Sequence, residues 1–161
     1  SYLAQIFQVM NDLPQHTFQI LTKRPERAAA WAGPWAPNIW QGTSIENRKA
    51  LARIDLLRQS AAHVRFLSCE PLIEDLGDID LSGIHWVIVG GESGREYRPM
   101  EHVWARRIRD QCVEQGVAFF FKQSAAYRTE IGTELIEADG SKSTWQQYPD
   151  MHATPNQMAL F

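Results

Sequence analysis

Charged and polar side chains follow each of five short apolar runs in this chain. Two of them, Glu70 and Glu92, form a carboxylate pair that could carry out hydrolysis if the two groups lay about 5 to 10 Å apart. The others are suited to binding, since ammonium and guanidinium groups attract anionic parts of a substrate and an amide forms hydrogen bonds. Substrate-binding roles are therefore predicted for Lys23, Arg24, Lys122 and Gln123.

A second set of candidates lies between an apolar run and a helical pattern, at residues 43–47. Free backbone N–H groups at the start of a helix can hold a carboxylate or a phosphate. Ser44 and Asn47 could then hydrogen-bond a ribose or an amino acid. Gly90 and Gly91, after a later run, would let the backbone approach a ligand closely. The predicted ligand-binding residues are Thr43, Ser44, Glu46, Asn47, Gly90 and Gly91.

Each of these assignments has a structural alternative. Thr43 and Glu46 have the spacing of a capping box, so residues 43–46 could serve only to start a helix. A glutamate at a strand end is costly to bury without a partner, so Glu70 could pair with Lys23. Lys122 could likewise pair with Glu92 or with Glu70. The sequence leaves both interpretations open.

Metal and nucleotide motifs are missing from this sequence. Cys69 and Cys112 are far apart and form no CxxC pair, so they are predicted to be core thiols. The histidines show no metal-ligand spacing, and we predict no metal site. The glycine-rich stretch at 90–94 matches neither GxGxxG nor the phosphate-binding P-loop.

The apolar runs read as strands that alternate with helical patterns. The predicted strands are residues 17–21, 39–42, 64–68, 84–89 and 117–121, and helices are predicted at 2–12, 26–31, 46–60 and 101–115, with a short one within 71–77. Alternation of this kind is typical of a parallel sheet. Since parallel strands end at one edge, the polar side chains after them should meet in one crevice.

The fold class predicted is α/β, as a partial and open TIM-like βα barrel of about five parallel strands. A closed barrel needs eight such units. A β-hairpin is expected over 134–148, within a single domain spanning 1–150, and residues 151–161 read as a tail. Unpaired edges at 17–21 and 117–121 should lead to self-association as a homo-oligomer, or be covered by the hairpin.

Composition narrows the classes of partner. The chain has 161 residues, is 44% hydrophobic and carries a net charge of −3, which argues against a generally basic nucleic-acid-coating surface. Basic residues near the strand ends could still make the mouth of the crevice positive. No apolar run approaches the roughly 18 to 20 residues that span a bilayer, so no membrane contact is predicted. Few cysteines and no export signal predict a cytoplasmic location.

Five ordered motifs carry a family resemblance: LTKRPER, GTSIEN, RFLSCEPL, WVIVGGESG and FFFKQ. In order and spacing they resemble the phage gene-product thirty-seven/sixty-eight family of uncharacterised phage and prophage proteins, over roughly residues 2–150. That family looks like a branch of the radical S-adenosylmethionine superfamily, similar to spore photoproduct lyase.

The resemblance implies several roles. Ser44, Glu46 and Asn47 would contact S-adenosylmethionine, while Glu70, Glu92 and Lys122 would face the substrate, which could be nucleic acid or nucleotide-like. Family members carry a cysteine cluster for a [4Fe–4S] centre in a segment upstream of these motifs, and nothing in this chain supplies three closely spaced cysteines. The cluster is therefore implied for a full-length form only.

Three functions follow as hypotheses. In the first, the chain is the C-terminal part of a radical-S-adenosylmethionine-like barrel that lacks the iron–sulfur segment and is catalytically silent alone. In the second, it is a barrel hydrolase that uses Glu70 and Glu92. In the third, it is a non-catalytic module that binds nucleic acid or another partner through a basic mouth.

Overall fold

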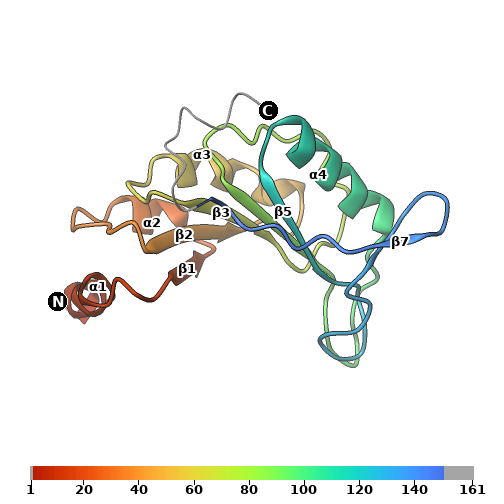
Figure 1. The fold of residues 1–161 in the computed structure, drawn as a ribbon, viewed down its shortest axis with the longest axis horizontal. Coiled ribbons are helices and arrows are strands. Elements are labelled where there is room, and N and C mark those ends of the chain that lie inside the picture. Colours follow the sequence, from red (N-terminus) through yellow and green to blue (C-terminus); the bar gives the residue numbers. More distant parts are fainter. Residues whose placement is uncertain (1, 151–161) are drawn as a thin grey trace.

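A five-stranded parallel sheet forms the centre of the protein. The computed structural model describes residues 2–150. The strands lie in sequence order and all pairs are parallel: β1 (Phe18–Thr22), β2 (Ile39–Ser44), β3 (Arg65–Cys69), β4 (Trp86–Gly90) and β5 (Ala118–Gln123). The sheet is open rather than closed into a barrel (Figure 1). The predicted fold class is confirmed.

The helices pack against one face of this sheet, which we call the helix-covered face. They are α2 (Pro25–Ala29), α3 (Ala52–Arg58), which follows the 3-10 turn η1 (Arg48–Ala50), and α4 (His102–Glu114). The first helix, α1 (Tyr2–Asp12), packs near the β1 edge of this face, since its Phe7 and Met10 share a core cluster with Ile39 of β2. In α4 the buried residues Ala105, Ile108 and Cys112 recur at helical spacing and so form one apolar side. After α4, Gly116 adopts a positive φ of 68°, as is usual where a helix ends.

Alternation along the strands separates the helix-covered face from the opposite face, which we call the open face. Leu67, Val87 and Phe119 are in register and belong to the core that includes Ile108 of α4. Their neighbours Phe66 and Trp86 belong to a separate aromatic cluster. Because successive side chains of a strand point to opposite faces, Phe66 and Trp86 lie on the open face.

The start of the third helical segment differs from its prediction. Thr43 lies inside β2, and its Oγ1 donates a hydrogen bond to the carbonyl oxygen of Thr22 at 2.9 Å. Asn47 precedes η1 without a capping hydrogen bond from its side chain. The capping box predicted at 43–46 is therefore wrong, because Thr43 belongs to β2, which ends at Ser44, and the first helical turn begins only at Arg48.

The short helix predicted within 71–77 is also absent. Residues 70–85 form an irregular connection whose apolar side chains, such as Leu72 and Leu76, still enter the core. Side chains satisfy its backbone in place of helical hydrogen bonds: Gln111 Oε1 accepts from Ile79 N at 2.6 Å and Gln115 Oε1 accepts from Leu81 N at 2.8 Å. Packing against α4 therefore replaces a local helix.

The predicted hairpin is present and leads into a segment that covers β5. It consists of β6 (Leu135–Ile136) and β7 (Lys142–Ser143), which pair antiparallel, with Gly140 at a φ of 84° in the turn. Beyond it, Phe121 N donates to Trp145 O at 2.8 Å and Gln147 N donates to Phe119 O at 3.0 Å.

Self-association or cover by the chain was expected at the two sheet edges. At the β5 edge, residues 145–147 provide that cover. Within residues 2–150, β1 pairs only with β2.

No helix in this range is long and apolar enough to cross a membrane. The predicted tail at 151–161 lies outside the described residues.

Candidate functional site

The strand ends meet at one edge of the sheet, and there Glu70 pairs with Lys122. Lys122 Nζ lies 3.0 Å from each carboxylate oxygen of Glu70. The two residues follow β3 and lie in β5, so the pair reaches across β4. Gly90 ends β4 there, and a Cβ at this position would lie 3.2 Å from Glu70 Cδ. The glycine leaves the room that this ion pair needs.

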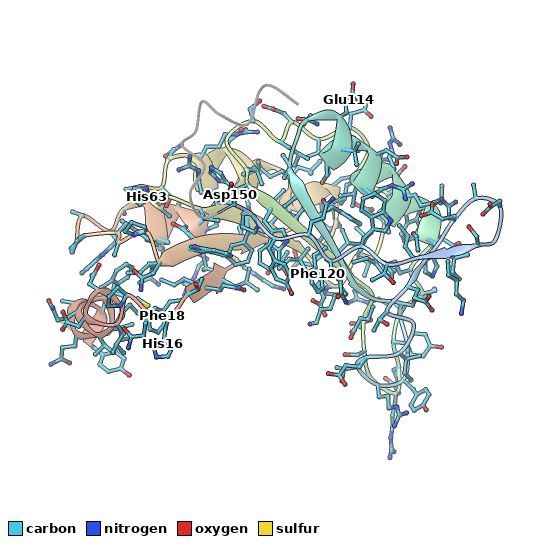
Figure 2. The ribbon with its side chains drawn as sticks, in the orientation of Figure 1. His16, Phe18, His63, Glu114, Phe120 and Asp150 are labelled. Carbon is cyan, nitrogen blue, oxygen red and sulfur yellow. The ribbon has the colours of Figure 1, made fainter. Side chains whose placement is uncertain are left out.

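Below this pair, the open face holds a cavity of about 460 Å³ with an aromatic floor. Trp86 is central to the floor, since its ring lies 5.8 Å from Phe66, 6.0 Å from Phe120 and 5.5 Å from Tyr148. Phe120 is labelled in Figure 2. Ser68, Gln19 and the Glu70–Lys122 pair add polar groups to the lining.

The cavity changes character along the strands. Phe66, Ser68 and Glu70 alternate along β3 and just beyond it, so they line the same face from the amino-terminal half to the carboxyl end. Gly42 is needed beside Phe66, because a Cβ there would come within 2.3 Å of the Phe66 ring. The cavity is therefore apolar at its base and charged at its rim.

Glu46, at the end of β2, is held by two basic side chains. It forms an ion pair with Lys23, and Arg53 Nη1 lies 2.9 Å from its other carboxylate oxygen. Burial raises the pKa of Glu46, but the hydrogen bonds from Lys23 and Arg53 outweigh it and hold this pKa below its usual value. The structural alternative that paired Glu70 with Lys23 is wrong, since Lys23 pairs with Glu46 and Glu70 with Lys122.

Thr43 and Gln123, both predicted to bind ligands, lie on the helix-covered face. Thr43 donates to a backbone carbonyl, as described above. Gln123 is 1% exposed; its Nε2 donates to Gly91 O at 3.3 Å, and its Oε1 accepts from Glu130 N at 2.9 Å. Both side chains therefore hold neighbouring backbone segments in place and do not line the cavity.

Glu92 is turned toward Arg98 rather than toward Glu70. Its two oxygens accept from Arg98 Nη2 at 2.7 Å and Nε at 2.8 Å. These hydrogen bonds lower the pKa of Glu92 to about 2. An ionised carboxylate cannot act as a general acid at neutral pH. With Glu70 held by Lys122, the geometry gives the two-glutamate hydrolase no support.

Gly91 serves the packing of the chain itself. A Cβ there would lie 2.1 Å from Ala125 N, on the segment that follows β5. Gly91 N also donates to Gln123 O at 2.9 Å. Gly90 and Gly91 were predicted to let the backbone approach a ligand. In the structure the groups packed closely against them are the Glu70 side chain and the backbone of Ala125.

A [4Fe–4S] cluster does not fit the residues of this chain. Cys69 and Cys112 are both fully buried in the core of the helix-covered face. Burial raises the pKa of Cys69 to about 12 and raises that of Cys112 as well, whereas iron is bound by thiolates. Residues 2–150 contain no group of three or more histidine, cysteine, aspartate or glutamate side chains that could hold a metal ion.

The predicted S-adenosylmethionine contacts fit only in part. Glu46 is engaged by Lys23 and Arg53, and Thr43 faces the helices. Ser44 remains on the open face, in register with Ser68, and Asn47 makes no capping hydrogen bond. Two hydrogen-bonding side chains are too few to define a site for the whole cofactor at residues 43–47.

A model of the family DUF5131, described as a protein of unknown function, matches residues 1–150. The chain belongs to this family. The match contains every strand of the sheet and all residues that line the cavity. No curated protein and no solved structure matches the chain.

The aromatic floor is the part of the site that sequence reasoning missed. The sequence analysis assigned site roles only to residues at or after the strand ends. The signal was present in the alternation of the strands, because Phe66 and Phe120 stand four and two residues before Glu70 and Lys122. Residues two apart on a strand share a face, so the polar strand ends predicted which apolar residues accompany them.

Proposed function

We propose that the open face binds S-adenosylmethionine, as part of a radical-S-adenosylmethionine-like barrel that this chain represents without the iron–sulfur segment. The observation that carries the proposal is the cavity with an aromatic floor and a Glu70–Lys122 rim. Its volume of about 460 Å³ lies within the range of small-molecule sites. In the absence of an iron–sulfur cluster, this chain binds the ligand but catalyses no reaction.

The layering of the cavity indicates the class of ligand. From Phe66 to Glu70 the strand direction rises about 13 Å, at about 3.3 Å per residue. That length suits a nucleoside-like molecule with a flat base over Trp86 and a polar group at the rim. The rim carries one carboxylate and one ammonium group. A zwitterionic head matches it, because an amino group would approach Glu70 and a carboxylate would approach Lys122.

S-adenosylmethionine has such a base and such a head, and its reductive cleavage would supply radical chemistry. That cleavage needs an iron–sulfur cluster, which Cys69 and Cys112 cannot hold. We therefore propose no bond-breaking step for this chain. Its own residues stack the base, orient the head between Glu70 and Lys122, and exclude water from the aromatic floor.

The setting proposed is a cytoplasmic protein of phage or prophage origin. The order of the five motifs supports the origin, and the two free buried thiols suit a reducing compartment. The outer side of β1, which pairs with no other strand within residues 2–150, supports self-association, since an unpaired strand edge can pair with another chain.

Calorimetric titration tests the proposed ligand class. S-adenosylmethionine should bind the chain more tightly than adenosine monophosphate, whose head is only anionic. Lys122→Met should weaken S-adenosylmethionine binding by about 10- to 150-fold, as expected for a charged hydrogen bond. Glu70→Gln should weaken it too, yet leave adenosine monophosphate binding equal or stronger.

Lys49→Met is the matched control, because Lys49 is exposed on η1 and is not part of the cavity lining. The proposal is abandoned if Lys122→Met and Phe120→Ala bind the ligand as the parent chain does. It is also abandoned if Lys49→Met weakens binding as much as Lys122→Met.

A further inference from the structure

Two loops extend together beyond the carboxyl ends of β4 and β5, and we call them the two-loop lobe. It consists of residues 91–98 and 124–132, and Figure 1 shows it projecting away from the sheet. The loops are joined by backbone hydrogen bonds, from Gly94 N to Ala126 O at 3.1 Å and from Ala126 N to Glu92 O at 3.0 Å. The lobe is therefore one unit.

Interactions at its base hold this lobe in a defined shape. The Gln123 side chain forms hydrogen bonds with Gly91 O and Glu130 N. Both carboxylate oxygens of Glu92 accept hydrogen bonds from the Arg98 guanidinium. Ser124 N donates to Gly132 O at 2.8 Å. The backbone that carries the exposed side chains is consequently held in place before any partner arrives, which reduces the entropy lost on binding.

Each loop of the lobe carries an exposed tyrosine and an exposed arginine. Tyr97 is 41% exposed and Tyr127 is 61% exposed. The guanidinium of Arg128 lies 5.6 Å from the centre of the Tyr127 ring. Arg95 is exposed on the neighbouring loop. Within residues 2–150, Arg95 and Arg128 form no ion pair, unlike Arg98.

Charge on the lobe limits the kind of partner. Glu96 and Glu130 lie on the same loops as Arg95 and Arg128, so these four exposed charges cancel. The whole chain carries a net charge of −3. A partner recognised mainly through many phosphates, such as a DNA duplex, does not match this surface. A partner recognised through stacking on aromatic rings does.

We propose that the two-loop lobe binds single-stranded nucleic acid, with bases stacked on Tyr97 and Tyr127 and phosphates contacted by Arg95 and Arg128. Unpaired bases expose their faces to aromatic side chains, and arginine adds cation–π contact, whereas bases in a duplex are already stacked. None of these four residues lines the open-face cavity. This inference therefore stands independently of the proposed function.

Fluorescence anisotropy with a fluorescein-labelled 12-nucleotide single strand of mixed sequence tests the proposal. Tyr127→Ala should weaken binding by about 5- to 150-fold, the range known for one stacked base, whereas Tyr127→Phe should bind nearly as the parent. Two phosphate contacts predict a plot of log affinity against log salt with a slope of about −1.4, and Arg128→Gln should reduce that slope by about 0.7.

Tyr2→Ala is the control, because Tyr2 is 79% exposed on α1 and should leave affinity unchanged. Circular dichroism verifies that each variant is folded. Equal affinity for the matched duplex would overturn the proposal, as would unchanged affinity of both Tyr97→Ala and Tyr127→Ala. Phe120→Ala and Lys122→Met should weaken S-adenosylmethionine binding yet leave oligonucleotide affinity within about twofold, so failure of one proposal is distinguishable from failure of the other.

Discussion

The two faces of the sheet use neighbouring residues of the same strands for opposite purposes. On the helix-covered face, Cys69 and Gln123 are buried. The Gln123 amide forms hydrogen bonds with two backbone groups. On the open face, Glu70 and Lys122 form the charged rim of a cavity. A shift of one residue along a strand therefore separates a structural role from a candidate binding role.

The difference arises from what covers each face. Helices fill the helix-covered face, so Gln123, which is buried there, takes its hydrogen-bond partners from the backbone. The open face carries a few aromatic rings and the segment that contains Tyr148, which leaves space for a ligand. Substitutions on the first face should change stability, and those on the second should change binding.

Adjacent phenylalanines of β5 provide the strongest test of this difference. Phe119 is fully buried under the helices, whereas Phe120 is half-buried on the open face. Phe119→Ala should lower the free energy of unfolding by about 3 to 5 kcal/mol. Phe120→Ala should cost less stability but weaken ligand binding. Urea unfolding followed by circular dichroism measures both variants, and equal losses would contradict the distinction.

The next pair along β5 should show a smaller effect. Gln123→Ala removes the partners of Gly91 O and Glu130 N, and each buried group left unsatisfied costs about 1 to 3 kcal/mol. Lys122→Met removes an exposed ion pair, which is worth at most about 1 kcal/mol. If urea unfolding finds Lys122→Met the less stable of the two, the assignment of the faces is wrong.

Gly90→Ala should affect binding with little loss of stability. The added methyl group would lie 3.2 Å from Glu70 Cδ, so the Glu70 side chain must move and its contact with Lys122 is disturbed. Stability should fall by about 1 kcal/mol or less, as for a small overpacking that a side chain can relieve. Calorimetry should show weaker binding of a zwitterionic nucleoside, and unchanged binding would show that the ion pair does not orient the ligand.

The most gradual effect should be a loss of stability in mild acid. Burial lowers the pKa of His85 and His102 below 6.5, with Arg65 and Arg106 adding repulsion. Each Nδ1 accepts a backbone hydrogen bond, from Arg65 N and Ile136 N respectively.

The unfolded chain therefore binds more protons than the folded one once the pH falls below about 6.5. Stability is complete above that pH and declines as the pH falls toward the folded pKa values. Unfolding midpoints between pH 7.5 and 5.5 measure the decline, which His102→Gln should reduce and His16→Gln, at an exposed position, should not. A midpoint that rises on acidification would contradict the account.

Much of the fold could be predicted from the sequence because local patterns determine it. The five apolar runs gave the strands in order, and the turns after them met at one edge. The start of α3 was mispredicted because Thr43 and Glu46 have a capping spacing, yet their partners Thr22 and Lys23 come from the neighbouring strand end. Such cross-strand contacts depend on register, which local spacing does not contain.

The candidate site was predicted only at its rim. Glu70 and Lys122 were identified from their places after strands, and their pairing was among the alternatives considered. That Gly90 makes room for the pair, and that Trp86 forms the floor, depends on the register between neighbouring strands. Strict use of alternation would have assigned Thr43 and Gln123 to the helix-covered face in advance.

The central claim is that the open face is the binding face, and the indole N–H signal of Trp86 tests it most directly. This N–H donates to Gln147 O at 2.9 Å beside the cavity, whereas Trp104 lies on α4. In a nitrogen-15 NMR titration with S-adenosylmethionine, we predict a saturable shift of the Trp86 signal and a constant Trp104 signal. A shift of Trp31 or Trp104 with Trp86 unchanged, or no shift at millimolar ligand, would contradict the account.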